Sequence, residues 1–69
     1  MSPLELRIRE LRTAKGWSQR ELARRADVRQ ATISHLESGQ AKTVDLGVLE
    51  RLAKAFKCDA GYLIAKKGK

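Results

Sequence analysis

Apolar residues recur three or four positions apart along most of the chain, which is the spacing of one face of an α-helix. No stretch alternates β-branched and polar residues as a strand does, so the pattern favours an all-helical fold. Five helices are expected, near residues 2–15, 19–26, 30–37, 46–57 and 60–65. Their apolar stripes predict a core made of Leu4, Ile8, Leu11, Leu22, Ala23, Ala26, Ile33, Leu36, Leu46, Leu49, Leu52, Ala53 and Phe56.

Residues with helix-capping side chains precede four of these segments. A side-chain oxygen at this position accepts a hydrogen bond from a free backbone N–H group of the first turn. The expected caps are Ser2, Ser18, Asp45 and Asp59. Gly16 and Gly39 are expected to end the first and third helices, because glycine adopts the left-handed conformation at little cost.

The length and charge of the chain limit what it can be. Its 69 residues suffice for one domain, which we place at residues 1–65, followed by a basic tail at 66–69. Fifteen Lys and Arg residues oppose eight Asp and Glu residues, so the net charge is +7. Such an excess predicts a polyanionic partner, either a nucleic acid or an acidic membrane surface.

Few residues offer catalytic or metal chemistry. The single cysteine, Cys58, excludes an internal disulfide, and with His35 it supplies too few ligands for a zinc site. The chain has no glycine-rich phosphate loop, carboxylate cluster or Ser-His-Asp arrangement, so we expect no enzyme activity, no cofactor and no metal. No apolar run exceeds four residues, which argues against a membrane-spanning helix, and nothing resembles a signal peptide. A protein of the reducing cytoplasm is expected.

The second and third predicted helices are short and lie only three residues apart. Helices joined so tightly must cross rather than run antiparallel, which is the geometry of a helix-turn-helix unit, and Ala23 supplies the small side chain that close crossing needs. Residues 30, 31, 34 and 35 share one face of the third helix, opposite Ile33 and Leu36. A polar face opposed to a buried one is what a helix needs to enter the major groove of DNA.

Two stretches carry a specific resemblance. Trp17-Ser18-Gln19-Arg20-Glu21-Leu22-Ala23, followed by Ala31-Thr32-Ile33-Ser34-His35-Leu36-Glu37-Ser38-Gly39, resembles the lambda-repressor-like (Cro/repressor-type, XRE-like) helix-turn-helix family. The segment 49–56 is similar to the family's fourth helix, and the resemblance covers roughly residues 4–65. It implies a five-helix bundle whose third helix enters the major groove of double-stranded DNA. Helix two and the loop after helix three would hold the phosphates.

The resemblance also implies roles for individual residues. The base-reading positions are Gln30, Ala31 and His35, with Ser34 beside them. Gln30 can bond bidentately to adenine, and Ala31 can contact a thymine methyl group, whereas His35 can donate or accept a hydrogen bond and is therefore assigned to no particular base. The phosphate-contacting positions are Gln19, Arg20, Gln40 and Lys42. Arg12 and Glu37 match a family pair that forms a largely buried salt bridge between helices one and three.

The sequence departs from the family pattern at the turn and at the cap of helix three. Asp27 stands where glycine is usual, and aspartate tolerates the left-handed conformation better than most residues. Arg29 replaces the usual Ser or Thr cap, and it cannot accept a hydrogen bond from the helix N-terminus. We expect Arg29 to serve DNA instead, at a phosphate or a guanine edge, although a plain surface charge is an equal alternative.

The function expected from these features is sequence-specific DNA binding by a transcriptional regulator, most simply a repressor. It would act in the prokaryotic cytoplasm or nucleoid, or be encoded by a phage, with no small-molecule ligand. An antitoxin-like or adaptor module that binds a protein is the alternative. A non-specific nucleoid or membrane-surface binder is a third possibility, for which a reading helix is unnecessary.

A homodimer on two-fold-related half-sites is also expected, since one recognition helix contacts too few base pairs to select a site. Tyr62 and Ile64 are the candidates to meet the second subunit, with Phe56 nearby in the core. The alternative is that these apolar side chains simply cover the fourth helix in a monomer.

Overall fold

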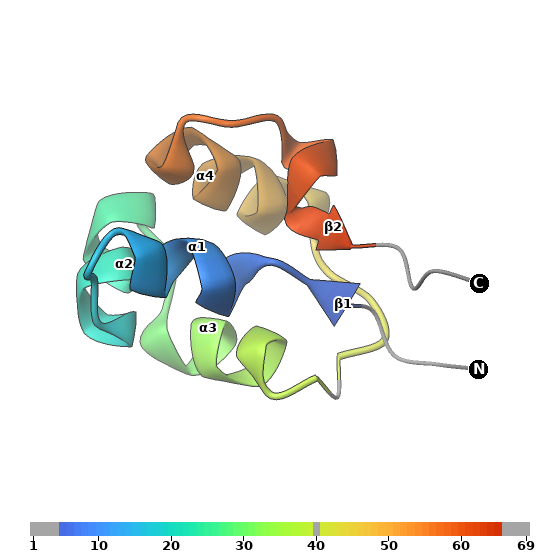
Figure 1. The fold of residues 1–69 in the computed structure, drawn as a ribbon. Coiled ribbons are helices and arrows are strands. Elements are labelled where there is room, and N and C mark those ends of the chain that lie inside the picture. The colour runs from blue at the N-terminus through green and yellow to red at the C-terminus, as the bar shows by residue number, and fades with distance from the viewer. Residues whose placement is uncertain (1–4, 40, 66–69) are drawn as a thin grey trace.

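Four short α-helices pack around one apolar core, and the first and last described segments, residues 5–6 and 64–65, lie side by side (Figure 1). The computed structural model describes residues 5–39 and 41–65. The elements are β1 (Glu5–Leu6), α1 (Ile8–Ala14), α2 (Gln19–Ala26), α3 (Gln30–Glu37), α4 (Leu46–Phe56), the 3₁₀ helix η1 (Ala60–Leu63) and β2 (Ile64–Ala65). None of the helices described is both long and apolar enough to cross a membrane.

The two middle helices of the sequence-based assignment, α2 and α3, have the expected bounds, and α4 ends one residue early. Lys57 takes a left-handed conformation with φ 60°, which stops α4 at Phe56. Ser18 and Asp45 are N-caps, since their side chains accept hydrogen bonds from backbone N–H groups of α2 and α4. Gly16 and Gly39 have φ values of 73° and 82°, as expected of residues that end a helix.

Both ends of the chain differ from the expectation. The first helix begins at Ile8 rather than near residue 2, because residues 5–6 pair antiparallel with residues 64–65. The expected fifth helix is a single 3₁₀ turn followed by this strand, and the Asp59 side chain makes no cap hydrogen bond. The five-helix assignment was therefore wrong at the ends. The expected cap Ser2, the core residue Leu4 and the tail 66–69 lie outside the described residues.

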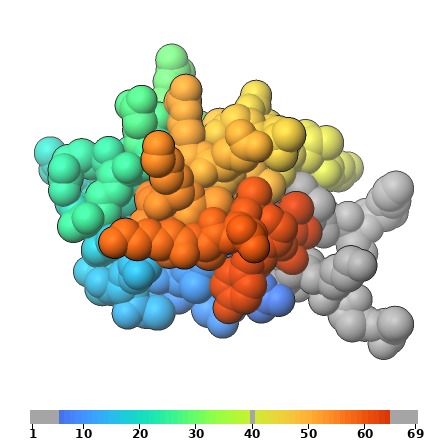
Figure 2. All heavy atoms as spheres, turned by 90° about the horizontal axis from the view of Figure 1, so that it is seen from above, coloured from blue at the N-terminus to red at the C-terminus, as the bar shows by residue number. Residues whose placement is uncertain are grey.

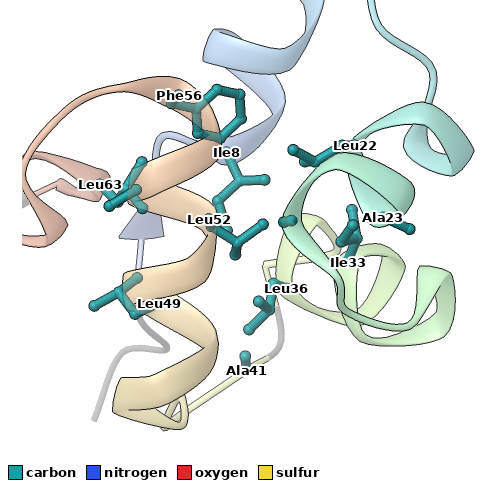
Figure 3. Close-up of a cluster of buried hydrophobic side chains, with 12 residues drawn as sticks. Ile8, Leu22, Ala23, Ile33, Leu36, Ala41, Leu49, Leu52, Phe56 and Leu63 are labelled. Atoms are coloured by element: carbon teal, nitrogen blue, oxygen red, sulfur yellow. The ribbon is translucent and has the colours of Figure 1, made fainter.

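The core draws on all four α-helices and on η1 (Figure 3). Leu52 of α4 is fully buried at its centre, in one cluster with Ile8, Leu22, Ile33 and Leu63. Ala41 and Leu63 are buried although neither was expected in the core, and Leu11 is only half-buried.

Leu46 was expected in the core but is 64% exposed. It is the first residue of α4, and helical side chains tilt toward the helix N-terminus. Its side chain therefore extends past the end of the packed stripe.

Leu52 is 0% exposed and Leu46 is 64% exposed, and both belong to α4, so the effects of truncating them can be compared directly. Leu52→Ala should lower the free energy of unfolding by about 2–5 kcal/mol, because it removes apolar contacts and leaves a cavity. Leu46→Ala should change it by less than about 0.5 kcal/mol. Urea titration followed by far-UV circular dichroism measures both. Equal losses would show that the core is placed wrongly.

Candidate nucleic-acid interface

The N-cap of α2 and the turn between α2 and α3 determine the geometry of the α2–α3 unit. The Ser18 hydroxyl accepts a hydrogen bond from the Glu21 N–H at 3.0 Å, which fixes where α2 begins. Asp27 ends α2 with φ 57° and ψ 47°, so the aspartate takes the left-handed conformation that the turn requires. Ala23 and Ala26 are buried, and their small side chains let the two helices approach closely.

Helix α3 begins without a side-chain cap. Arg29 is extended, with φ −74° and ψ 142°, and its side chain makes no cap hydrogen bond. The first turn of α3 also lacks an acidic residue. The positive end of the helix dipole thus has neither a side-chain cap nor an acidic residue in its first turn, and the free N–H groups can face water or an anionic partner.

The exposed side of α3 carries the residues expected to read bases. Arg29, Gln30, Ala31, Ser34 and His35 are all exposed. On the opposite side, Ile33 and Leu36 are 0% and 5% exposed. The structure therefore brings the five expected residues together on one accessible surface, which presents hydrogen-bonding groups and a single methyl group.

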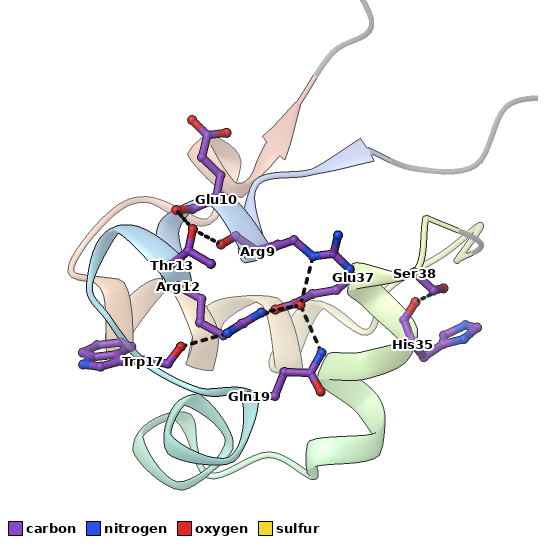
Figure 4. Close-up of polar contacts among 9 residues, drawn as sticks. All are labelled: Arg9, Glu10, Arg12, Thr13, Trp17, Gln19, His35, Glu37 and Ser38. Carbon is purple, nitrogen blue, oxygen red and sulfur yellow. Dashed lines mark hydrogen bonds and ion pairs between the residues drawn. The ribbon is translucent and has the colours of Figure 1, made fainter.

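The Glu37 carboxylate fixes α3 to the rest of the bundle (Figure 4). Its side chain is 1% exposed and forms an ion pair with Arg12, with 2.7 Å between Nε and Oε2. Arg12 Nη2 and Gln19 Nε2 donate to the other oxygen at 3.0 and 3.1 Å. Arg9 contacts it at 3.5 Å from a mostly exposed position. One carboxylate at the end of α3 thereby joins α1 and the start of α2.

This carboxylate stays ionised despite its burial. Burial alone would raise the pKa of Glu37, but the hydrogen bonds from Arg12 and Gln19 outweigh it, and the pKa lies below its ordinary value. The hydrogen bond to Glu37 raises the pKa of Arg12 in turn. Arg12 is held further by a 2.8 Å bond from Nη1 to the Trp17 carbonyl, so the guanidinium has little freedom to leave.

Comparison with known proteins agrees with this geometry. Residues 8–63 match the family model described as Helix-turn-helix (HTH_3). The chain belongs to this lambda-repressor-like family. It is also similar to a competence pilus inhibition repressor of Acinetobacter baylyi, with 38% identity over 56 residues. The match covers 81% of this chain and 50% of that protein, so the chain spans about half of the relative's length. No solved structure matches the chain.

The residues of this helix-turn-helix domain that were expected to contact phosphates differ in their exposure to solvent. Arg20 and Lys42 are exposed, at the start of α2 and in the loop before α4. Gln40 lies outside the described residues. Gln19 is half-buried, and its amide nitrogen donates to Glu37. An amide has two N–H donors, so only one remains for a phosphate. This second role of Gln19 was not anticipated.

Trp17 was expected to pack within the domain, but its aromatic contacts were not. Its ring stacks on Phe56 at 5.8 Å between centroids, and Arg25 lies 4.5 Å from the ring centroid. The half-buried tryptophan thus links the start of α2 to the end of α4. No local sequence pattern could have predicted this stacking, because Trp17 and Phe56 are far apart in the sequence.

Glu37→Gln should lower the free energy of unfolding at neutral pH by about 3 kcal/mol. This value is the lower end of the range for breaking a buried ion pair, because the amide of glutamine keeps some of the hydrogen bonds. The pKa of Glu37 is lowered by folding, so its contribution is complete above the ordinary pKa of glutamate. It is lost as the pH falls through the lower folded value. The difference between parent and variant should therefore shrink in acid.

Urea unfolding of both proteins across the acidic range measures this. Glu21→Gln is the matched control, since the Glu21 carboxylate pairs with Arg24 and Arg25 at the exposed surface. Such surface pairs contribute little. A constant difference between parent and Glu37→Gln at every pH would contradict the assignment.

Proposed function

We propose that this chain is the sequence-specific DNA-binding domain of a transcriptional regulator, most simply a repressor, and that α3 enters the major groove. The observation that carries the proposal is the polar, exposed face of α3, opposed by Ile33 and Leu36 and fixed by Glu37. Family membership, the net charge of +7 and a relative whose name includes "repressor" support it.

The face of α3 divides into base-reading and positioning groups. Gln30 offers an amide that pairs bidentately with adenine, and Ala31 offers a methyl group to thymine. Ser34 and His35 can each donate or accept a hydrogen bond. Arg29 stands at the uncapped end of α3, where its side chain can reach a guanine edge or a phosphate. A repressor needs no more than this, since occupying a promoter blocks polymerase.

The proposed phosphate contacts come from residues before and after α3 in the sequence. Arg20 and Lys42, with Gln19 and Gln40, are proposed to hold the backbone and set the register of α3 in the groove. Gln19 would then contact DNA and Glu37 at once, so a phosphate contact would be linked directly to the end of the recognition helix.

A homodimer is proposed as the DNA-bound state. Three large apolar residues are exposed in the described part of the chain: Leu46, Tyr62 and Ile64, at 64%, 52% and 38%. Tyr62 is held in place, since Arg7 donates to its carbonyl at 2.9 Å and lies 5.1 Å from its ring centroid. Burying these residues against a second copy removes apolar surface from water and doubles the length of DNA that is read.

Gln30→Ala tests the proposed reading face. The variant should bind a duplex obtained by in vitro selection about 1–3 kcal/mol less tightly and lose preference at one base position. Thr13→Ala removes a polar group from α1, where the hydroxyl bonds only to its own helix, and should bind as the parent does. Fluorescence anisotropy at one fixed salt concentration measures both. Unchanged affinity and preference for Gln30→Ala would place base reading elsewhere.

Ile64→Lys tests the dimer. Sedimentation velocity at micromolar protein with a palindromic selected duplex should show two parent subunits on each duplex, with half-sites roughly 34–36 Å apart. The variant should bind a single half-site normally and fill the second site less readily, because the new charge cannot be buried. One parent subunit per duplex at saturation would refute the dimer and leave DNA binding intact.

A further inference from the structure

A basic groove runs along α4 on the side where the α2–α3 turn packs against it. It consists of two adjoining hollows of about 350 and 440 Å³ that share Asp27 and Arg51. The first is completed by Arg25, Ala26, Lys54 and Ala55, and the second by Val28, Arg29, Thr32 and Val48. In Figure 2 the side chains of the α2–α3 segment and of α4, green and orange, project together at the upper edge.

The rim of this basic groove carries four cationic side chains and one anionic one. Arg25, Lys54, Arg51 and Arg29 lie on both sides of Asp27. Two of the arginines are held in place within the protein. Arg51 Nη1 donates to the Asp27 carbonyl at 3.2 Å, and Arg25 pairs with Glu21 at 2.6 Å over the Trp17 ring. Fixed cations lose little conformational freedom when they bind an anion.

The floor of the basic groove is apolar. Ala26 is buried, and Ala55, Val28 and Val48 are half-buried and pack against the core. Both hollows therefore offer small aliphatic side chains between positive charges. A ligand that matches this arrangement has separated negative charges with apolar groups between them, which describes an acidic peptide better than a sugar-phosphate chain.

The first hollow of the basic groove lies apart from the proposed DNA surface. Gln30, Ala31, Ser34 and His35 line neither hollow, whereas Arg29 lines the second one. The first hollow lies at the C-terminal end of α2, and the phosphate contacts proposed on α2 lie at its N-terminal end, about 10 Å away at 1.5 Å per residue. We propose that the basic groove, through its first hollow, binds an acidic, partly apolar segment of a partner protein while the reading face of α3 is free to hold DNA.

A fluorescein-labelled peptide of four Glu-Glu-Leu repeats tests this proposal by anisotropy with the whole chain. It should bind more tightly than the matched peptide of Gln-Gln-Leu repeats, and Lys54→Glu should weaken it about tenfold, equivalent to about 1.4 kcal/mol. Lys57→Glu makes the same charge change at a residue that lines neither hollow, and should change affinity less than about twofold. Equal binding of both peptides, or equal effects of both substitutions, would overturn the proposal.

DNA distinguishes this site from the proposed reading face. The peptide should bind the preformed complex with a selected duplex as well as the free protein, and Lys54→Glu should leave DNA affinity and its salt dependence unchanged. Displacement of the peptide by DNA would overturn the proposal. So would a loss of about one unit in the slope of log K against log salt for Lys54→Glu, which would assign Lys54 to a DNA phosphate. Peptide binding is measured first without DNA, so failure of the proposed function leaves this test intact.

Discussion

A single buried carboxylate holds α3 in place. Glu37 lies at the last position of α3, where the helix needs an anchor to the bundle, and it accepts hydrogen bonds from side chains of α1 and α2. An ionised group in an apolar setting is costly unless it is paired and its oxygens are satisfied. Here Arg12 supplies the charge and Gln19 a further donor, so the orientation of α3 depends on one set of interactions.

The two ends of α3 differ in how they are stabilised. Its C-terminal end is fixed by an internal ion pair, whereas its N-terminal end has no side-chain cap and begins at an arginine. The usual Ser or Thr cap would satisfy one backbone N–H and add stability. Without it, the free N–H groups of the first turn are left to water or to another partner. The α3 helix is therefore anchored to the bundle at its C-terminal end and uncapped at its N-terminal end.

Sequence reasoning located the middle of the fold well and its ends poorly. The bounds of α2 and α3 followed from caps and turn chemistry, which act within a few residues, and the Arg12–Glu37 pair followed from resemblance to a family. The β1–β2 pairing was missed although Leu6 and Ile8 alternate with Glu5 and Arg7, because four alternating residues are too few to be told from the start of a helix. Leu46 was misplaced since periodicity ignores where a packed stripe ends. The bond from Gln19 to Glu37, the Trp17–Phe56 stack and the basic groove required the tertiary arrangement.

The pairing of residues 5–6 with residues 64–65 also bears on how the domain opens. The Arg7 N–H donates to the Leu63 carbonyl at 2.8 Å, so the entry to α1 and the exit from η1 share backbone hydrogen bonds. This contact brings together segments near opposite ends of the chain. Its formation therefore costs the entropy of closing a loop that includes nearly the whole chain. Fraying at one end therefore releases the other. Backbone amides of both ends should exchange with solvent as one cooperative unit, whereas those of the α2–α3 unit are protected by local contacts.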